Sequence, residues 1–264
     1  MTYFHKVSDL FHSVYEEIEN RQAKYKNTWL TQLNNMTDCL KPGMLSIVAG
    51  RPKMGTTSLA LTIAKNLTIE RKKVIYISLT AEPMELTLRL LSAISSIELT
   101  KIQSGNLTED DWKHISEAKE IISKTDLHIG NLSDSIQKPM FMEMLYSECY
   151  ALKPFDLLIV DDASLIDSQS LWHDLKSLAT VLSVAVIAIP KVHTIGHRVL
   201  LEDNIHQEAN SITYLNRRDK DAELYIMPSK SDEQLAIYLT YDKKLATFID
   251  KEKESELDVS DVPF

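Results

Sequence analysis

Residues 45–58 constrain the fold of this chain more than any other stretch. The apolar run 45–49 predicts a buried strand, Gly50 opens a loop that Gly55 closes, and the pattern of 57–67 predicts a helix. A loop between a strand and a helix binds anions, because its N–H groups and the helix N-terminus both point at the ligand. We therefore predict a nucleotide-binding loop whose contacts come from Gly50, Lys53, Met54, Gly55, Thr56, Thr57 and Ser58.

The loop lacks one residue of the full phosphate-loop pattern, G-x-x-x-x-G-K-[ST]. Both glycines and the final hydroxyl of Thr57 are present, but Thr56 stands where the pattern has lysine. That lysine neutralises charge on the β- and γ-phosphates of a bound nucleotide. Two interpretations stay open: the loop only shapes the turn between strand and helix, or it binds phosphate weakly with Lys53 as a partial substitute.

Composition excludes several classes of protein. The 264 residues are 44% hydrophobic and carry a net charge of −9, as expected for a globular chain that is not broadly basic. Cys39 and Cys149 are too few for a disulfide framework or a zinc site, which favours a reducing, cytoplasmic location. There is no apolar run of about 18 residues and no signal-peptide pattern, so we expect no membrane contact.

The remaining pattern alternates strands and helices. Expected strands lie at 74–79, 126–129, 155–160, 185–189, 212–215, 224–226 and 235–241, and expected helices at 84–97, 109–124, 139–152 and 169–182. Residues 190–205 are expected to form a polar loop. Alternation of this kind predicts an α/β fold with a mainly parallel central sheet, helices on both faces and antiparallel strands at one edge.

Both ends of the chain differ from this core. Apolar residues recur at a helical period within 7–26, which predicts an amphipathic helix in a first segment, 1–26, that needs a partner surface. The α/β domain is expected over 27–249. Residues 250–264 are acidic and poor in apolar side chains, which favours a disordered tail.

Several stretches together resemble the motor domain of bacterial replicative helicases of the DnaB type, a RecA-like domain preceded by a linker helix. They are Glu17 to Gln22, Leu40 to Gly43, Gly50 to Gly55, Ile77 to Leu79, Thr100 to Trp112 and Phe155 to Asp161. The resemblance covers about residues 7–250 and implies a protein of DNA replication that forms rings and binds ATP, Mg²⁺ and DNA. We expect the chain to begin at the linker helix, without the family's primase-contacting domain.

The resemblance fails at positions that carry the family's chemistry. Its lysine, catalytic glutamate, strand-end glutamine and closing arginine fall at Thr56, Thr80, Lys191 and Lys230. Asp161 keeps the position of the metal-binding aspartate, and Glu82 lies two residues beyond the missing glutamate. We therefore assign no catalytic residue, and we expect any ATP or Mg²⁺ to bind weakly. Loss of one charge-stabilising donor typically costs about 2.7–4 kcal/mol of transition-state stabilisation, so several losses indicate a very slow or inactive ATPase.

Two functions follow. The first is a catalytically degenerate pseudo-helicase that binds helicase subunits, its own copies or replication factors. The alternative is an ATP-dependent DNA helicase with a rewired site that uses Lys53, Glu82 and Lys230. Candidate contacts to DNA phosphates are Arg198, Arg217, Arg218, Lys243 and Lys244. Three histidines, at 193, 197 and 206, are more typical of a solvated surface than of a metal site.

The last residues have a resemblance of their own. Asp258 and Asp261 precede Val262-Pro263-Phe264, which is similar to the acidic tip of bacterial single-stranded-DNA-binding protein. The resemblance implies binding to replication and repair proteins that read that tip, with Phe264 in an apolar pocket and the acids on a basic rim. The alternative is a tail that serves only solubility.

Overall fold

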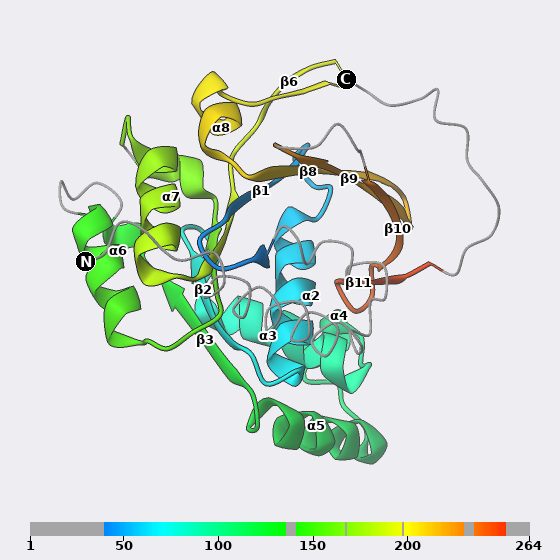
Figure 1. Ribbon diagram of the computed structural model, residues 1–264. Helices are drawn as coiled ribbons and strands as arrows, with labels where there is room; N and C mark the ends of the chain where they lie inside the picture. Colours follow the sequence, from blue (N-terminus) through cyan, green and yellow to red (C-terminus); the bar gives the residue numbers. More distant parts are fainter. Residues whose placement is uncertain (1–39, 136–140, 167, 197, 230–234, 252–264) are drawn as a thin grey trace, which may run out of the picture.

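A computed structural model describes residues 40–135, 141–166, 168–196, 198–229 and 235–251. Its centre is a nine-stranded sheet with the strand order β11-β10-β9-β8-β1-β5-β4-β2-β3 (Figure 1). In chain order the strands are β1 Leu45–Gly50, β2 Lys73–Ser78, β3 Asp126–Asn131, β4 Leu157–Asp161, β5 Ala185–Ile189, β8 Ser211–Arg218, β9 Asp221–Pro228, β10 Leu235–Asp242 and β11 Thr247–Asp250.

The sheet has a parallel part and an antiparallel part, as the sequence predicts. β1 pairs in parallel with β5 on one side and β8 on the other, and the parallel pairing continues through β4, β2 and β3. From β8 outward the pairs β8–β9, β9–β10 and β10–β11 are antiparallel. Parallel strands bring their carboxyl ends to one edge, so the ends of β1, β4 and β2 meet where ligands bind in folds of this type.

Helices cover both faces of the sheet, which explains why the central strands read as continuous apolar runs. One face packs against α2 Thr56–Ile69 and α3 Pro83–Ser95. The other packs against α6 Phe141–Ala151, α7 Leu171–Leu182 and the short α8 Asp203–Glu208 (Figure 1). Each face has its own cluster of buried side chains, and alternate residues of one strand, such as Leu158 and Ile159, belong to opposite clusters.

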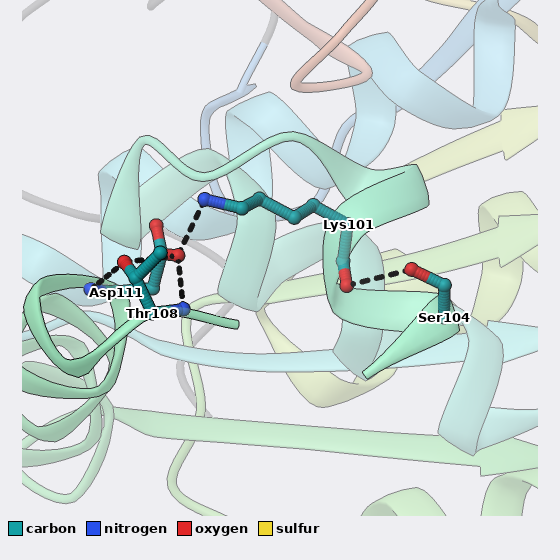
Figure 2. Close-up of polar contacts among 4 residues, drawn as sticks. All are labelled: Lys101, Ser104, Thr108 and Asp111. Carbon is teal, nitrogen blue, oxygen red and sulfur yellow. Dashed lines mark hydrogen bonds and ion pairs between the residues drawn. The ribbon is translucent and has the colours of Figure 1, made fainter. Parts of the chain in front are cut away.

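The helices α4 Leu99–Ser104 and α5 Glu109–Ile122 lie outside this sandwich, next to α3. The N-terminus of α5 is satisfied by a capping box: Thr108 accepts from the Asp111 N–H, and Asp111 accepts from the Thr108 N–H at 2.7 Å. Lys101 of α4 also donates to Asp111, so one carboxylate joins the two helices (Figure 2). These contacts give part of the Thr100 to Trp112 stretch a structural role.

Two expectations about secondary structure are wrong. Residues 190–205 contain a hairpin of the exposed β6 His193–Ile195 and β7 Arg198–Leu200, followed by the start of α8, where a loop was expected. The strand β11 was not predicted either, so Asp250 closes a strand and does not begin the tail. Three- and four-residue strands are too short for a periodic pattern to reveal.

Other expectations fall outside the described residues. They concern the amphipathic helix of 7–26 and the tail tip from Asp258 to Phe264. Among the residues that the structure does describe, no helix is long and apolar enough to cross a membrane.

Candidate functional site

The loop between β1 and α2 has the shape that its two glycines require. Gly55 has φ 102°, and a Cβ there would lie 3.2 Å from Cζ of Phe248 in β11. Gly55 is also the N-cap of α2, which has neither a side-chain cap nor an acidic residue in its first turn. The positive end of this helix therefore faces the loop without a negative side chain of its own, as an anion site requires.

Thr56 brings no charge to this loop. A Cβ on Gly50 would lie 2.9 Å from Cγ2 of Thr56, so the threonine side chain sits over the end of β1. Lys53, the proposed substitute for the missing lysine, is exposed and has a left-handed backbone with φ 69°. The loop can therefore offer backbone N–H groups to a phosphate, while Thr56 supplies a hydroxyl and a methyl group in place of an ammonium.

Arg217 of β8 fixes the conformation of the loop from the neighbouring strand. Its Nε donates to the carbonyl oxygen of Met54 at 2.9 Å and its Nη2 to that of Lys53 at 2.7 Å. The guanidinium also lies 4.3 Å from the ring centroid of Tyr241. Sequence reasoning placed Arg217 among the DNA contacts, and nothing local in the sequence indicates its link to a loop 163 residues away.

Asp161 lies at the end of β4 and is only 2% exposed. Its Oδ2 accepts a hydrogen bond from the hydroxyl of Tyr76 in β2 at 2.7 Å. Burial raises the pKa of Asp161, against the lowering effect of Tyr76, the Thr57 side chain and the Asp162 N–H. Burial likewise raises the pKa of Tyr76, helped by the neighbouring carboxylate. Sequence reasoning selected Asp161 and Thr57 but missed Tyr76.

The neighbouring polar groups are paired with one another. Thr80, at the position of the family's glutamate, is exposed and donates to Oδ2 of Asp162 at 2.5 Å. Glu82 is the N-cap of α3, and its Oε1 accepts from Nδ2 of Asn131 at 3.3 Å. The carboxylate of Glu82 is therefore held toward the end of β3.

The other predicted residues do not gather at this loop. Lys191 is exposed just after β5, and Lys230 lies outside the described residues. Arg198 belongs to β7, and exposed Arg218 ends β8. Lys243 is exposed, and Lys244 forms an ion pair with Glu98 next to α4. Within the described ranges, no three His, Cys, Asp or Glu side chains gather in a way that could hold a metal ion.

The site therefore fits the two parts of a magnesium nucleotide unequally. The glycine-shaped loop and the uncapped start of α2 fit a phosphate. Asp161 and Thr57 are the hard oxygen donors that Mg²⁺ prefers, but Oδ2 of the buried Asp161 carboxylate already accepts the hydrogen bond of the Tyr76 hydroxyl. The arrangement fits an anion better than a cation.

A family model and curated relatives with a similar sequence identify proteins to which this chain is similar. A family model described as "DnaB-like helicase C terminal domain" matches residues 27–255. The replicative DNA helicase DnaB of Buchnera aphidicola subsp. Baizongia pistaciae is 30% identical over 202 residues, which are 71% of this chain and 42% of that protein. The replicative DNA helicase DnaC of Bacillus subtilis is 27% identical over 247 residues, which are 82% of this chain and 53% of that protein. The chain thus spans about half the length of these curated relatives.

Solved structures confirm the predicted RecA-like α/β fold. One that is described as an ATPase domain aligns with a TM-score of 0.82 at 24% identity, covering 94% of this chain and all (100%) of that one. A DnaB-like replicative helicase, described with its interactions with primase, aligns with a TM-score of 0.77 at 24% identity and covers 94% of this chain and 68% of that one.

Proposed function

Because the chain belongs to the family of DnaB-like helicase C-terminal domains, we propose that it is a pseudo-helicase of DNA replication. It keeps the fold and the phosphate-binding loop of the family and acts by binding helicase subunits, its own copies or replication factors. ATP turnover is very slow or absent. Contacts to DNA phosphates involve the exposed basic residues outside the loop, such as Arg218.

The observation that carries this proposal is the side chain of Thr56. It lies over Gly50 at the start of the helix and has no charge to place on a β- or γ-phosphate. Thr80 is bonded to Asp162 and is not a general base. A single missing charge-stabilising donor costs on the order of 10²–10³-fold in rate, so these two positions alone account for a large loss.

The residues that remain can bind and orient a phosphate. The backbone from Gly50 to Gly55 is held in shape by Arg217, and the N-terminus of α2 provides the favourable field. The Thr57 side chain lowers the pKa of Asp161 at the end of β4, against the effect of burial. This loop can hold a nucleotide as a structural ligand without catalysing its hydrolysis.

The test is Mg-ATP turnover with and without single-stranded DNA, using the full chain and Thr56→Lys. We expect no DNA-stimulated hydrolysis by either protein, because Thr56→Lys restores phosphate binding but supplies neither glutamate nor arginine. A fluorescent ATP analogue should bind Thr56→Lys more tightly than the unmodified protein. Robust hydrolysis by the unmodified protein would overturn the proposal.

The second candidate is a helicase that has rewired its nucleotide site. It is favoured by exposed Lys53 in the loop and by Glu82, which lies at the start of α3 near the strand ends. This candidate requires turnover that disappears in Lys53→Ala and in Glu82→Gln. Lys191→Ala is the matched control, because Lys191 is an exposed lysine beyond β5 that neither candidate uses in this way.

The proposed mode of binding uses the amphipathic segment 7–26. We propose that it docks on a helicase subunit or on a second copy, as its apolar stripe requires a partner surface. Deletion of residues 1–26 should leave the α/β domain folded by circular dichroism and abolish association in light scattering. Monomers of both proteins, with no helicase subunit bound by either, would contradict this mode of assembly.

A further inference from the structure

We propose that the hydrogen bond from Tyr76 prevents divalent cations from binding the Asp161 carboxylate. The loop then binds phosphate without a metal ion at the end of β4. The inference deepens the proposed function, since it concerns the same site and rests on that site being a phosphate loop. It assigns to Tyr76 a positioning role, exerted through the Asp161 carboxylate.

The sheet itself brings the two side chains together. β2 and β4 are parallel neighbours in which Tyr76 pairs with Ile159 and Ser78 pairs with Asp161. Tyr76 and Asp161 are therefore diagonal neighbours on the face that α2 covers, at a separation that an aromatic side chain can span. Tyr76 has no exposed surface, and its hydroxyl ends 2.7 Å from Oδ2 of Asp161.

The hydrogen bond from Tyr76 occupies Oδ2 of Asp161, an oxygen that a cation would otherwise contact. The bond is 2.7 Å long, and both side chains are buried. A hydrogen bond to a buried carboxylate oxygen stabilises the charged group inside the protein without a metal or a lysine. A cation that bound Oδ2 would have to displace a buried hydroxyl that has no other acceptor among its described contacts.

A second tyrosine–carboxylate pair provides a matched control. Tyr225 of β9 donates to Oε2 of Glu223, also at 2.7 Å, on the antiparallel part of the sheet. The two pairs share the same chemistry and length, but the Tyr225 pair belongs to neither the loop nor β4. Loss of the Tyr225 hydroxyl should therefore leave cation binding unchanged.

The experiment is a titration with Mn²⁺, used as a spectroscopic substitute for Mg²⁺ and followed by electron paramagnetic resonance of free Mn²⁺. It uses the full chain without nucleotide, as the unmodified protein, Tyr76→Phe, Tyr225→Phe, Asp161→Asn and Tyr76→Phe/Asp161→Asn. Circular dichroism checks that each variant is folded. Because no ATP and no partner protein is present, the result is separate from the turnover and association assays that test the proposed function.

Tyr76→Phe should bind one Mn²⁺ at least about tenfold more tightly than the unmodified protein, since a competing hydrogen bond to a charged group is gone. The double variant should lose this gain, and Tyr225→Phe should match the unmodified protein. Equal Mn²⁺ affinity of folded Tyr76→Phe and the unmodified protein would overturn the proposal.

A comparison that does not need Tyr76→Phe to fold tests the same point. The unmodified protein and Asp161→Asn should bind Mn²⁺ equally, because an Asp161 carboxylate held by Tyr76 does not contribute to Mn²⁺ binding. A Mn²⁺ site that is present in the unmodified protein and lost in Asp161→Asn would overturn the proposal independently.

Discussion

The N-termini of α2 and α5 differ in whether side chains cap their backbone N–H groups. Both helices have 14 residues and begin with backbone N–H groups that lack partners within the helix. At α5, the Thr108 side chain caps the helix and three acidic residues follow in the first turn. At α2, the cap is Gly55, with no side-chain hydrogen bond and no acidic residue.

The difference shows which helix start is stabilised within the chain and which is left for a ligand. Local polar side chains satisfy α5, so it needs nothing from outside. The start of α2 is instead shaped by distant residues, with Phe248 against Gly55 and Arg217 on the loop carbonyls. A helix start without a side-chain cap keeps its backbone N–H groups available to an anion.

The largest expected effect comes from Gly55→Ala. The substitution forces a side chain into a backbone with φ 102° and places its Cβ 3.2 Å from Phe248. We expect a loss of about 2–3 kcal/mol in the free energy of unfolding, from left-handed strain plus the displaced ring, measured by urea denaturation. Gly105→Ala is the control: Gly105 has φ 69° at the end of α4, but its Cβ would meet nothing within 4 Å. It should cost about 1–2 kcal/mol, and an equal loss at both glycines would show that Phe248 does not constrain the loop.

A smaller effect is expected for Thr108→Ala. The capped start of α5 should lose about 1 kcal/mol of stability, the usual cost of removing a capping hydroxyl. Thr87→Ala is its control, because the Thr87 hydroxyl donates to the Pro83 carbonyl inside a helix turn and caps nothing. In thermal unfolding, that substitution should change the free energy of unfolding by less than about 0.5 kcal/mol. Equal losses at the two threonines would remove the distinction between the two helix starts.

The pH dependence of Asp111 sharpens the same comparison. Hydrogen bonds from Lys101 and Thr108 lower the pKa of Asp111, so its carboxylate stabilises the folded chain while it is ionised. This contribution is fully present above the pKa of the unfolded chain, about 3.9, and is lost as the pH falls below that value. The stability difference between the unmodified protein and Asp111→Asn should therefore be constant near neutral pH and narrow below about pH 4. A constant difference down to pH 3, in urea denaturation at each pH, would contradict this assignment.

The smallest expected effect is that of Lys101→Gln. The Lys101–Asp111 pair lies partly exposed between α4 and α5 (Figure 2), and such pairs typically contribute less than about 1 kcal/mol. The loss should shrink in about 1 M salt, where exposed charges are screened. An effect that is as large as that of Thr108→Ala and insensitive to salt would show that Lys101 is part of the cap itself.

Elements that depend on neighbouring residues were predictable from the sequence, whereas contacts between residues far apart in the sequence were not. The apolar runs of β1 and β4, Pro83 at the start of α3 and the Thr108 cap all follow from local patterns. The contact of Arg217 with the loop joins residues 163 positions apart, and no local pattern encodes it. The same holds for Tyr76, which reads as one more apolar residue of a buried strand until β4 places Asp161 diagonally beside it.

Because the loop depends on Arg217 and Phe248, its folding during synthesis has to wait for these late residues. A chain that leaves the ribosome from its N-terminus exposes Gly50 to Gly55 long before these two partners are made. β2 and β3 can pair and α2 can pack on them while synthesis continues, but β1 pairs with the later strands β5 and β8. Until then the loop lacks the contacts that fix its carbonyls and cover Gly55. Closing so long a loop in the chain is slow, because the entropy of the intervening residues is lost before the contacts form. We therefore expect the anion site to be among the last parts of the domain to reach its final shape.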